Sequence, residues 1–308
     1  MRSCLDPEAL SGRVTFITGP ERQCGKTSLL NAALARLRNS GERSAFFGIG
    51  FDGEAREAAG FSGRARIDCE EGEVIVSSER YLKAMCPLPE MLDVVPGSTA
   101  LGRLAIARAR RGGPVALVGP ERNEYAAWIV ERIRSEGWAK TILVDGSINR
   151  ITQVASFAGS RFLFSLRVSD SSLDREVERI CRLYRLLSLR PLAGLSEEEA
   201  GEAYRFGGAL TQEAADLIPE KSRSVVVDDF TKVFLRASEL RAFLRRHELY
   251  VKSPIEFGGF VVILREIPEA RFLGALAAAA SAAQLDAEAL LGLVCFNPYL
   301  ALPRREAV

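Results

Sequence analysis

The sequence has little of what several common functions need. Its 308 residues include one histidine, His247, and carry a formal net charge of +1. We interpret His247, in the charged segment AFLRRHEL, as a surface residue. The presence of a single histidine argues against a Ser-His-Asp triad and against a histidine-rich metal site. A charge near zero gives no reason to expect a nucleic-acid partner or an anionic membrane surface as a partner.

Long apolar runs and paired cysteines are also missing. The most apolar segment, FLGALAAAASAAQL (272–285), is too short to span a bilayer and predicts a packed helix, and the N-terminus lacks the apolar core of a secretory signal. We therefore expect a cytoplasmic protein with reduced thiols. No C-x-x-C pair indicates zinc or a disulfide framework, because the cysteines are far apart, at positions 4, 24, 69, 86, 181 and 295.

Apolar runs of strand length alternate with longer segments of helical period. This pattern predicts an α/β fold, a mostly parallel sheet with helices on both faces. Several of the runs are almost continuous Val, Ile, Leu and Phe, as in strands that are buried on both faces. The predicted strands are 14–18, 44–50, 115–118, 141–144, 161–166, 224–227, 259–264 and 291–296. Helices are predicted over 26–39, ending at Ser40-Gly41, and over 123–135, ending at Gly137.

Residues 60–112 interrupt the alternation. RARIDCEEGEVIVSS (64–78) predicts a hairpin that closes around Glu70-Glu71-Gly72. The alternation over 99–113 suits a half-exposed strand at least as well as a helix. We predict a small β-rich lobe at 60–112, inserted in a core formed by 1–59 and 113–308.

One stretch, VTFITGPERQCGKTSLL (14–30), has the layout of a phosphate-binding loop. A predicted strand ends in glycine, and Gly-Lys-Thr opens a predicted helix. The usual spacing is G-x-x-x-x-G-K-[ST], but here five residues separate Gly19 from Gly25.

Each residue type in this loop suits a phosphate ligand. Gly25 lets the backbone approach closely, Lys26 supplies a cation for the β- and γ-phosphates, and Thr27 supplies a hydroxyl for Mg²⁺. The helix N-terminus adds its dipole. The predicted nucleotide-binding residues are Gly19, Gln23, Cys24, Gly25, Lys26, Thr27 and Ser28. A second stretch, LVGPERNEYAAWIV (117–130), repeats Gly-Pro-Glu-Arg without the lysine, and is either an anion site or a second strand-to-helix turn.

The five-residue spacing resembles the P-loop of dethiobiotin synthetase and its relatives, in the SIMIBI class of P-loop NTPases with MinD, the nitrogenase iron protein and metallochaperone NTPases. GIGFDGE (48–54) and TILVDGSINR (141–150) are similar to the stretches where this class places acidic residues. Residues 161–187 resemble the strand, loop and helix that follow. The resemblance covers about 12–55 and 115–190, and it implies ATP and Mg²⁺ as cofactors.

The resemblance assigns two carboxylates. Asp145 would be the Walker-B-type residue that reaches Mg²⁺, and Asp52 a second acid that assists the metal or the attacking water. With Lys26 these are the predicted catalytic residues, and with Thr27 the predicted metal ligands. Either aspartate could instead only close a turn, and Asp228 and Asp229 are rival carboxylates at another strand end.

Three functions stay open. The first is an ATP-hydrolysing protein that activates a small acceptor or remodels a partner protein. The second is a slow regulatory NTPase, since the sequence also resembles ATP-dependent reactivation factors of cobalamin-dependent aminomutases. The third is a P-loop fold that has lost its nucleotide. The segment FDGEAREAAGFSGR replaces the lysine-rich segment of the synthetases, which argues against dethiobiotin synthesis itself.

The partner predictions follow from these functions. ATP is favoured over GTP because Thr231-Lys232 lacks the aspartate that reads guanine. The expected partners are the nucleotide, a possible enzyme subunit and a possible second copy of the chain, with no nucleic acid and no membrane.

Overall fold

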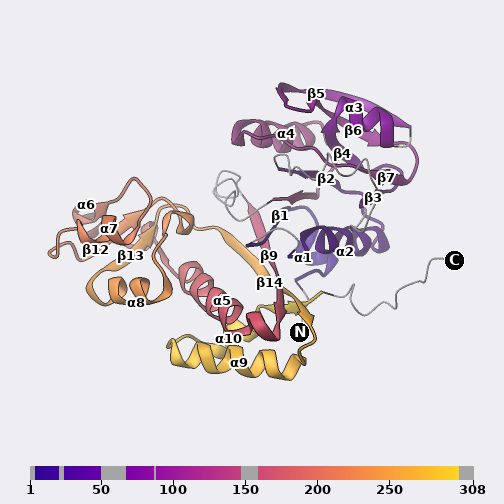
Figure 1. The fold of residues 1–308 in the computed structure, drawn as a ribbon. Helices are drawn as coiled ribbons and strands as arrows, with labels where there is room; N and C mark the ends of the chain where they lie inside the picture. Colours follow the sequence, from indigo (N-terminus) through magenta and orange to yellow (C-terminus); the bar gives the residue numbers. More distant parts are fainter. Residues whose placement is uncertain (1–3, 21–23, 50–66, 87, 147–158, 298–308) are drawn as a thin grey trace. The chain divides into compact units, whose positions relative to one another are not determined.

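The computed structural model describes residues 4–20, 24–49, 67–86, 88–146 and 159–297. They form two compact units. Unit 1 comprises Met1–Arg167, Gly258–Ile263 and Cys295–Val308, and unit 2 comprises Val168–Phe257 and Leu264–Val294. Figure 1 labels many of the elements of both units.

Unit 1 is built on a nine-stranded sheet of order β15-β14-β9-β1-β8-β2-β4-β6-β5. The run β9-β1-β8-β2-β4 is parallel, and β6 and β5 continue it antiparallel. The predicted α/β class with a mostly parallel sheet is confirmed. The strands are β1 Val14–Thr18, β2 Ala45–Gly48, β4 Val74–Ser78, β5 Pro89–Thr99, β6 Gly102–Ala109, β8 Ile142–Asp145, β9 Ser160–Ser169, β14 Glu256–Arg265 and β15 Val294–Phe296.

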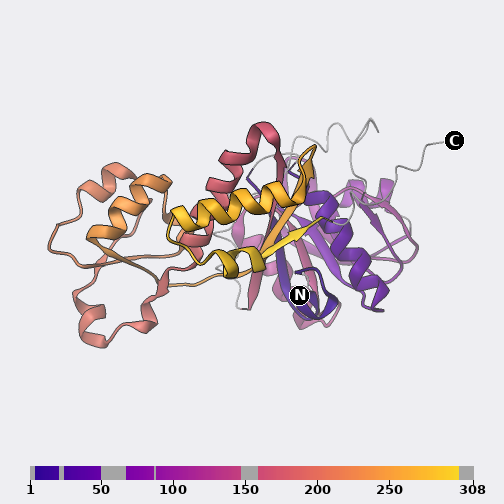
Figure 2. The same ribbon diagram turned by 90° about the horizontal axis from the view of Figure 1, so that it is seen from below.

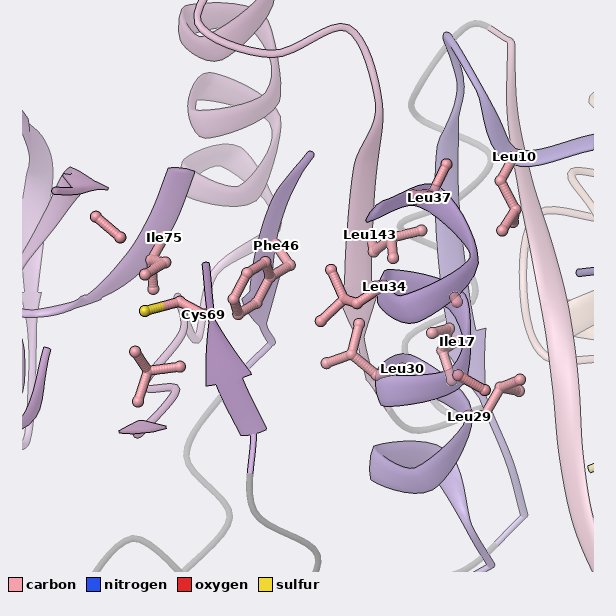
Figure 3. Close-up of a cluster of buried hydrophobic side chains, with 14 of the residues drawn as sticks. Leu10, Ile17, Leu29, Leu30, Leu34, Leu37, Phe46, Cys69, Ile75 and Leu143 are labelled. Carbon is pink, nitrogen blue, oxygen red and sulfur yellow. The ribbon is translucent and has the colours of Figure 1, made fainter. Parts of the chain in front are cut away.

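Helix α2 (Lys26–Asn39) covers one face of this sheet through an apolar stripe. Leu30 and Leu34 lie over the central strands in Figure 3, beside Phe46 of β2 and Leu143 of β8. All four side chains are fully buried, and each such burial contributes about 1.5–3 kcal/mol. The helix ends where the sequence predicts, because Gly41 adopts a left-handed φ of 81°. The other helices of unit 1 are α1 (Pro7–Leu10), α3 (Glu79–Met85) and α4 (Asn123–Ser135).

The region expected to form an inserted lobe contributes strands to the main sheet. β4, β6 and β5 lie at one end of it, with β4 parallel to β2. The predicted 64–78 hairpin is wrong: β3 (Ile67–Cys69) pairs with β7 (Gly113–Val115), whereas β4 pairs with β2 and β6. The turn at Glu70–Glu73 is present, but it passes the chain from one sheet to another.

Unit 2 combines a second sheet with a helical layer. Its four short strands are all parallel, in the order β10-β13-β12-β11. In the layer, α9 packs against α5 and α10 (Figure 2). The strands are β10 Arg190–Pro191, β11 Tyr204–Arg205, β12 Ser224–Val227 and β13 Glu248–Val251; the helices are α5 Leu173–Leu187, α6 Glu197–Glu202, α7 Gln212–Asp216, α8 Ala237–Arg246, α9 Glu269–Ala282 and α10 Ala287–Gly292.

His247 corrects the sequence interpretation, because it is buried in unit 2. Its ring lies 4.8 Å from that of Phe243, and Nδ1 lies 2.7 Å from the carbonyl oxygen of Ser222. The ring therefore packs at the end of α8 as a structural residue.

Candidate functional site

The two glycines of the loop between β1 and α2 lie where no side chain fits. A Cβ on Gly19 would lie 2.6 Å from the carbonyl oxygen of Ser165, and a Cβ on Gly25 would lie 2.1 Å from Cδ1 of Ile263. Gly25 also has a left-handed φ of 97° and caps α2. Both glycines are therefore required by the fold of the loop. The predicted ligand Gln23 lies outside the described residues.

The first turn of α2 presents the Gly-Lys-Thr motif. The helix begins at Lys26, has no acidic residue in its first turn, and receives no hydrogen bond from a capping side chain. The N–H groups of the first turn have no partners within a helix and carry the positive end of its dipole. Lys26 Nζ donates to Cys24 Sγ at 3.7 Å, so the lysine lies over the loop. Thr27 and Ser28 follow it in the same turn, half-buried.

Two serine and threonine hydroxyls attach the loop to the neighbouring strand. Ser165 Oγ of β9 donates to the carbonyl oxygen of Cys24 at 2.9 Å, and Thr18 Oγ1 donates to the carbonyl oxygen of Leu163 at 3.0 Å. Both hydroxyl residues are buried. Sequence reasoning missed Ser165; the available signal was a polar residue within the apolar run RFLFSLRV.

Asp145 ends the strand next to the one that carries the loop. β8 and β1 are parallel, and Ile17 is in register with Asp145. The N–H of Gly146 donates to the carbonyl oxygen of Ile17 at 3.0 Å, which fixes the two strand ends together. The half-buried Asp145 side chain therefore belongs to the same carboxyl edge of the sheet as the loop, the edge at which open α/β sheets bind ligands.

The other predicted carboxylates are Asp52, Asp228 and Asp229. Asp52 lies outside the described residues. Asp228 and Asp229 belong to unit 2, whereas the loop belongs to unit 1. Asp228 forms an ion pair with Lys252 at 2.6 Å, and Asp229 Oδ1 accepts the N–H of Thr231 at 2.7 Å. Both rivals are therefore committed to local structure.

The second Gly-Pro-Glu-Arg turn has a structural explanation. A Cβ on Gly119 would lie 1.6 Å from the carbonyl oxygen of Gly48, so the glycine permits close contact with the end of β2. Arg122 forms an ion pair with Glu124 at 2.9 Å. The predicted strand over 115–118 is wrong, since β7 ends at Val115 and belongs to the two-stranded sheet.

Among the described residues, no group of three or more histidine, cysteine, aspartate or glutamate side chains could hold a metal ion. In the same part of the chain no helix has both the length and the apolar character needed to cross a membrane. None of the six cysteines forms a disulfide in the structure.

No protein-family model matches the sequence, and no curated protein matches it significantly. A solved structure, the MinC:MinD cell division protein complex of Aquifex aeolicus, is similar at 15% identity and a TM-score of 0.31, over 91% of this chain and 96% of that chain. A similarity at this level assigns no function, so the proposal below rests on the geometry of the loop.

Proposed function

We propose that the chain binds Mg-ATP in the loop between β1 and α2 and hydrolyses it. The observation that carries this proposal is the conformation of Gly25, a left-handed residue with no room for a Cβ directly before Lys26 at the start of α2. Such a junction turns successive N–H groups toward one point, which is the requirement for holding phosphate oxygens.

Lys26 supplies a positive charge at this edge for the phosphates of a nucleoside triphosphate. Lys26 would contact the β- and γ-phosphates once it leaves Cys24, a weak thiol partner at 3.7 Å. Phosphoryl transfer needs mostly positioning and charge neutralisation, and few protein groups are sufficient for it.

Magnesium would be held by the phosphates, Thr27 and Asp145. Hydroxyl and carboxylate oxygens are the ligands that Mg²⁺ takes in proteins, and it usually keeps several waters. The register of Ile17 with Asp145 supports a carboxylate at the metal side of the loop. Asp52 remains the proposed second acid.

In more detail, we propose that the chain works like the dethiobiotin-synthetase-like class and uses ATP to activate a small acceptor or to remodel a partner protein. A slow regulatory NTPase and a fold without nucleotide are the alternatives. An acceptor-using enzyme releases ADP only when its acceptor is present. A regulatory NTPase hydrolyses slowly until a protein partner binds, and a fold without nucleotide does neither.

Thermal unfolding with and without nucleotide tests the proposal. Since a ligand that binds only the folded chain stabilises it by RT ln(1 + [L]/Kd), ATP·Mg at 100 times its Kd adds about 2.7 kcal/mol and raises Tm. GTP·Mg should raise Tm less. Lys26→Ala should abolish the shift, whereas Lys140→Ala, at an exposed lysine of unit 1, should keep it. No shift of the wild type with either nucleotide would contradict the proposal.

A further inference from the structure

Unit 2 contains a cavity of about 440 Å³, lined by α5, α8 and α9. This volume lies within the range of small-molecule sites, roughly 300–1,000 Å³. All of its lining residues belong to unit 2, whereas the loop between β1 and α2 belongs to unit 1. The cavity and the proposed nucleotide site therefore belong to different units.

Small side chains on α9 leave the space open. Ala275, Ala279 and Ala282 recur at intervals of four and three residues, so they share one face of that helix. Val177 of α5 and Leu240 of α8 add larger apolar groups to the lining. A ligand in this cavity would meet an apolar surface over part of its body.

Two arginines of α5 are held in place at the cavity by main-chain carbonyls. Arg182 donates from Nε to the carbonyl oxygen of Leu235 at 2.8 Å and from Nη2 to that of Val233 at 2.9 Å. Arg185 Nη2 donates to the carbonyl oxygen of Ala283. Both arginines are half-buried, and burial lowers the pKa of each guanidinium group. Neutral carbonyls orient both cations, and the carboxylate of Glu239 also acts on the charge of Arg182.

A third arginine adds charge at the same place. Arg241 of α8 also lines the cavity, and its charge lowers the pKa of Arg185 further, beyond the effect of burial. No carboxylate in the described part of the chain forms an ion pair with either residue at 4.0 Å or less. The acidic lining residues Asp174 and Glu178 lie toward the other end of α5, with Glu178 about 10 Å along the helix axis from Arg185.

We propose that this cavity is a binding site for a small organic anion, whose carboxylate or phosphate pairs with Arg185 and Arg241 and whose carbon chain packs on the alanines of α9. Arginine suits both groups because its planar donors match their oxygens. The charge of the anion would also relieve the repulsion between the two guanidinium groups.

Calorimetric titration of the full chain with hexanoate, inorganic phosphate and hexylammonium tests the charge requirement. The Lys26→Ala background removes phosphate binding at the loop, so failure here and failure of the proposed nucleotide site are separate results. Hexanoate should bind and hexylammonium should not. Binding of phosphate alone supports an anion site that takes phosphorylated ligands.

Matched variants locate the site. Arg241→Gln should weaken anion binding about tenfold or more, the loss expected for a charged hydrogen bond. Arg245→Gln should not, because Arg245 is exposed like Arg241 and lies on the same helix but does not line the cavity. Ala279→Leu should fill the cavity and weaken hexanoate binding, while Ala278→Leu, exposed on α9, should leave it unchanged. The proposal is overturned if neither anion binds the wild type, or if Arg241→Gln and Arg245→Gln bind equally.

Discussion

Replacing Gly25 by alanine tests whether the loop is built as described. The new Cβ would lie 2.1 Å from Cδ1 of Ile263, far inside van der Waals contact, at a residue whose φ is 97°. The left-handed backbone costs about 1–2 kcal/mol for a residue with a Cβ, and overpacking adds about 1–3 kcal/mol. Gly25→Ala should therefore lower the free energy of unfolding of unit 1 by about 2–5 kcal/mol.

Two further variants separate the two costs. Gly137 has a left-handed φ of 66°, and no heavy atom lies within 4 Å of the place where a Cβ would be. Gly137→Ala should therefore lower the free energy of unfolding by the backbone cost alone. Ile263→Val deletes the clashing Cδ1 and costs about 0.5–1.5 kcal/mol by itself. Combined with Gly25→Ala it should recover most of the overpacking cost, giving a coupling energy of about 1–3 kcal/mol.

Urea unfolding followed by tryptophan fluorescence measures the free energy of unfolding of unit 1, which contains all of these variants. The chain has two tryptophans, Trp128 and Trp138, and both belong to unit 1. Strict additivity of Gly25→Ala and Ile263→Val, or equal losses in Gly25→Ala and Gly137→Ala, would refute the described packing of Gly25 against β14.

Three other changes have defined outcomes. Ser165→Ala removes the donor to the Cys24 carbonyl and should cost about 1–3 kcal/mol in urea unfolding while also weakening ATP·Mg binding; unchanged binding would show that this anchor does not shape the loop. Glu73→Gln removes the fully buried carboxylate that lies 2.7 Å from Arg38 and leaves this arginine with the more distant and more exposed Glu70 at 3.8 Å, so it should cost about 3–5 kcal/mol; a loss below 1 kcal/mol would contradict the pair. Burial raises the pKa of Asp93, but the guanidinium of Arg132 at 2.6 Å outweighs the effect of burial and leaves this pKa below its usual value. The ion pair therefore stabilises the fold above about pH 4, and this stabilisation is lost as the pH falls through the lowered pKa. The advantage of wild type over Asp93→Asn in urea midpoint should shrink between pH 6 and pH 3, and a constant advantage would refute it.

The sequence predicted the parts of the fold that depend on local pattern. β1 is buried along its whole length, as its apolar run indicates, and α2 ends at Ser40 and Gly41 because glycine accepts the left-handed residue. The position of Asp145 at a strand end was also predicted, since the short run Thr141–Val144, with three apolar residues, precedes it. These features are encoded within a few residues of where they occur.

Long-range pairing was not predictable in the same way. β3 and β4 are adjacent in the chain and read as a hairpin, yet β3 pairs with β7 while β4 enters the main sheet. The boundary of unit 2 at Val168 falls within β9, where apolar periodicity is continuous. Ser165 could not be assigned from sequence because its role depends on β9 lying next to β1.

The most direct test of the central claim is calorimetric titration of the chain with ATP·Mg. The loop between β1 and α2 predicts one nucleotide bound per chain, lost in Lys26→Ala and in Thr27→Val when Mg²⁺ is present, and retained in Lys140→Ala. Heat of binding that persists unchanged in Lys26→Ala, or none in the wild type, would contradict it.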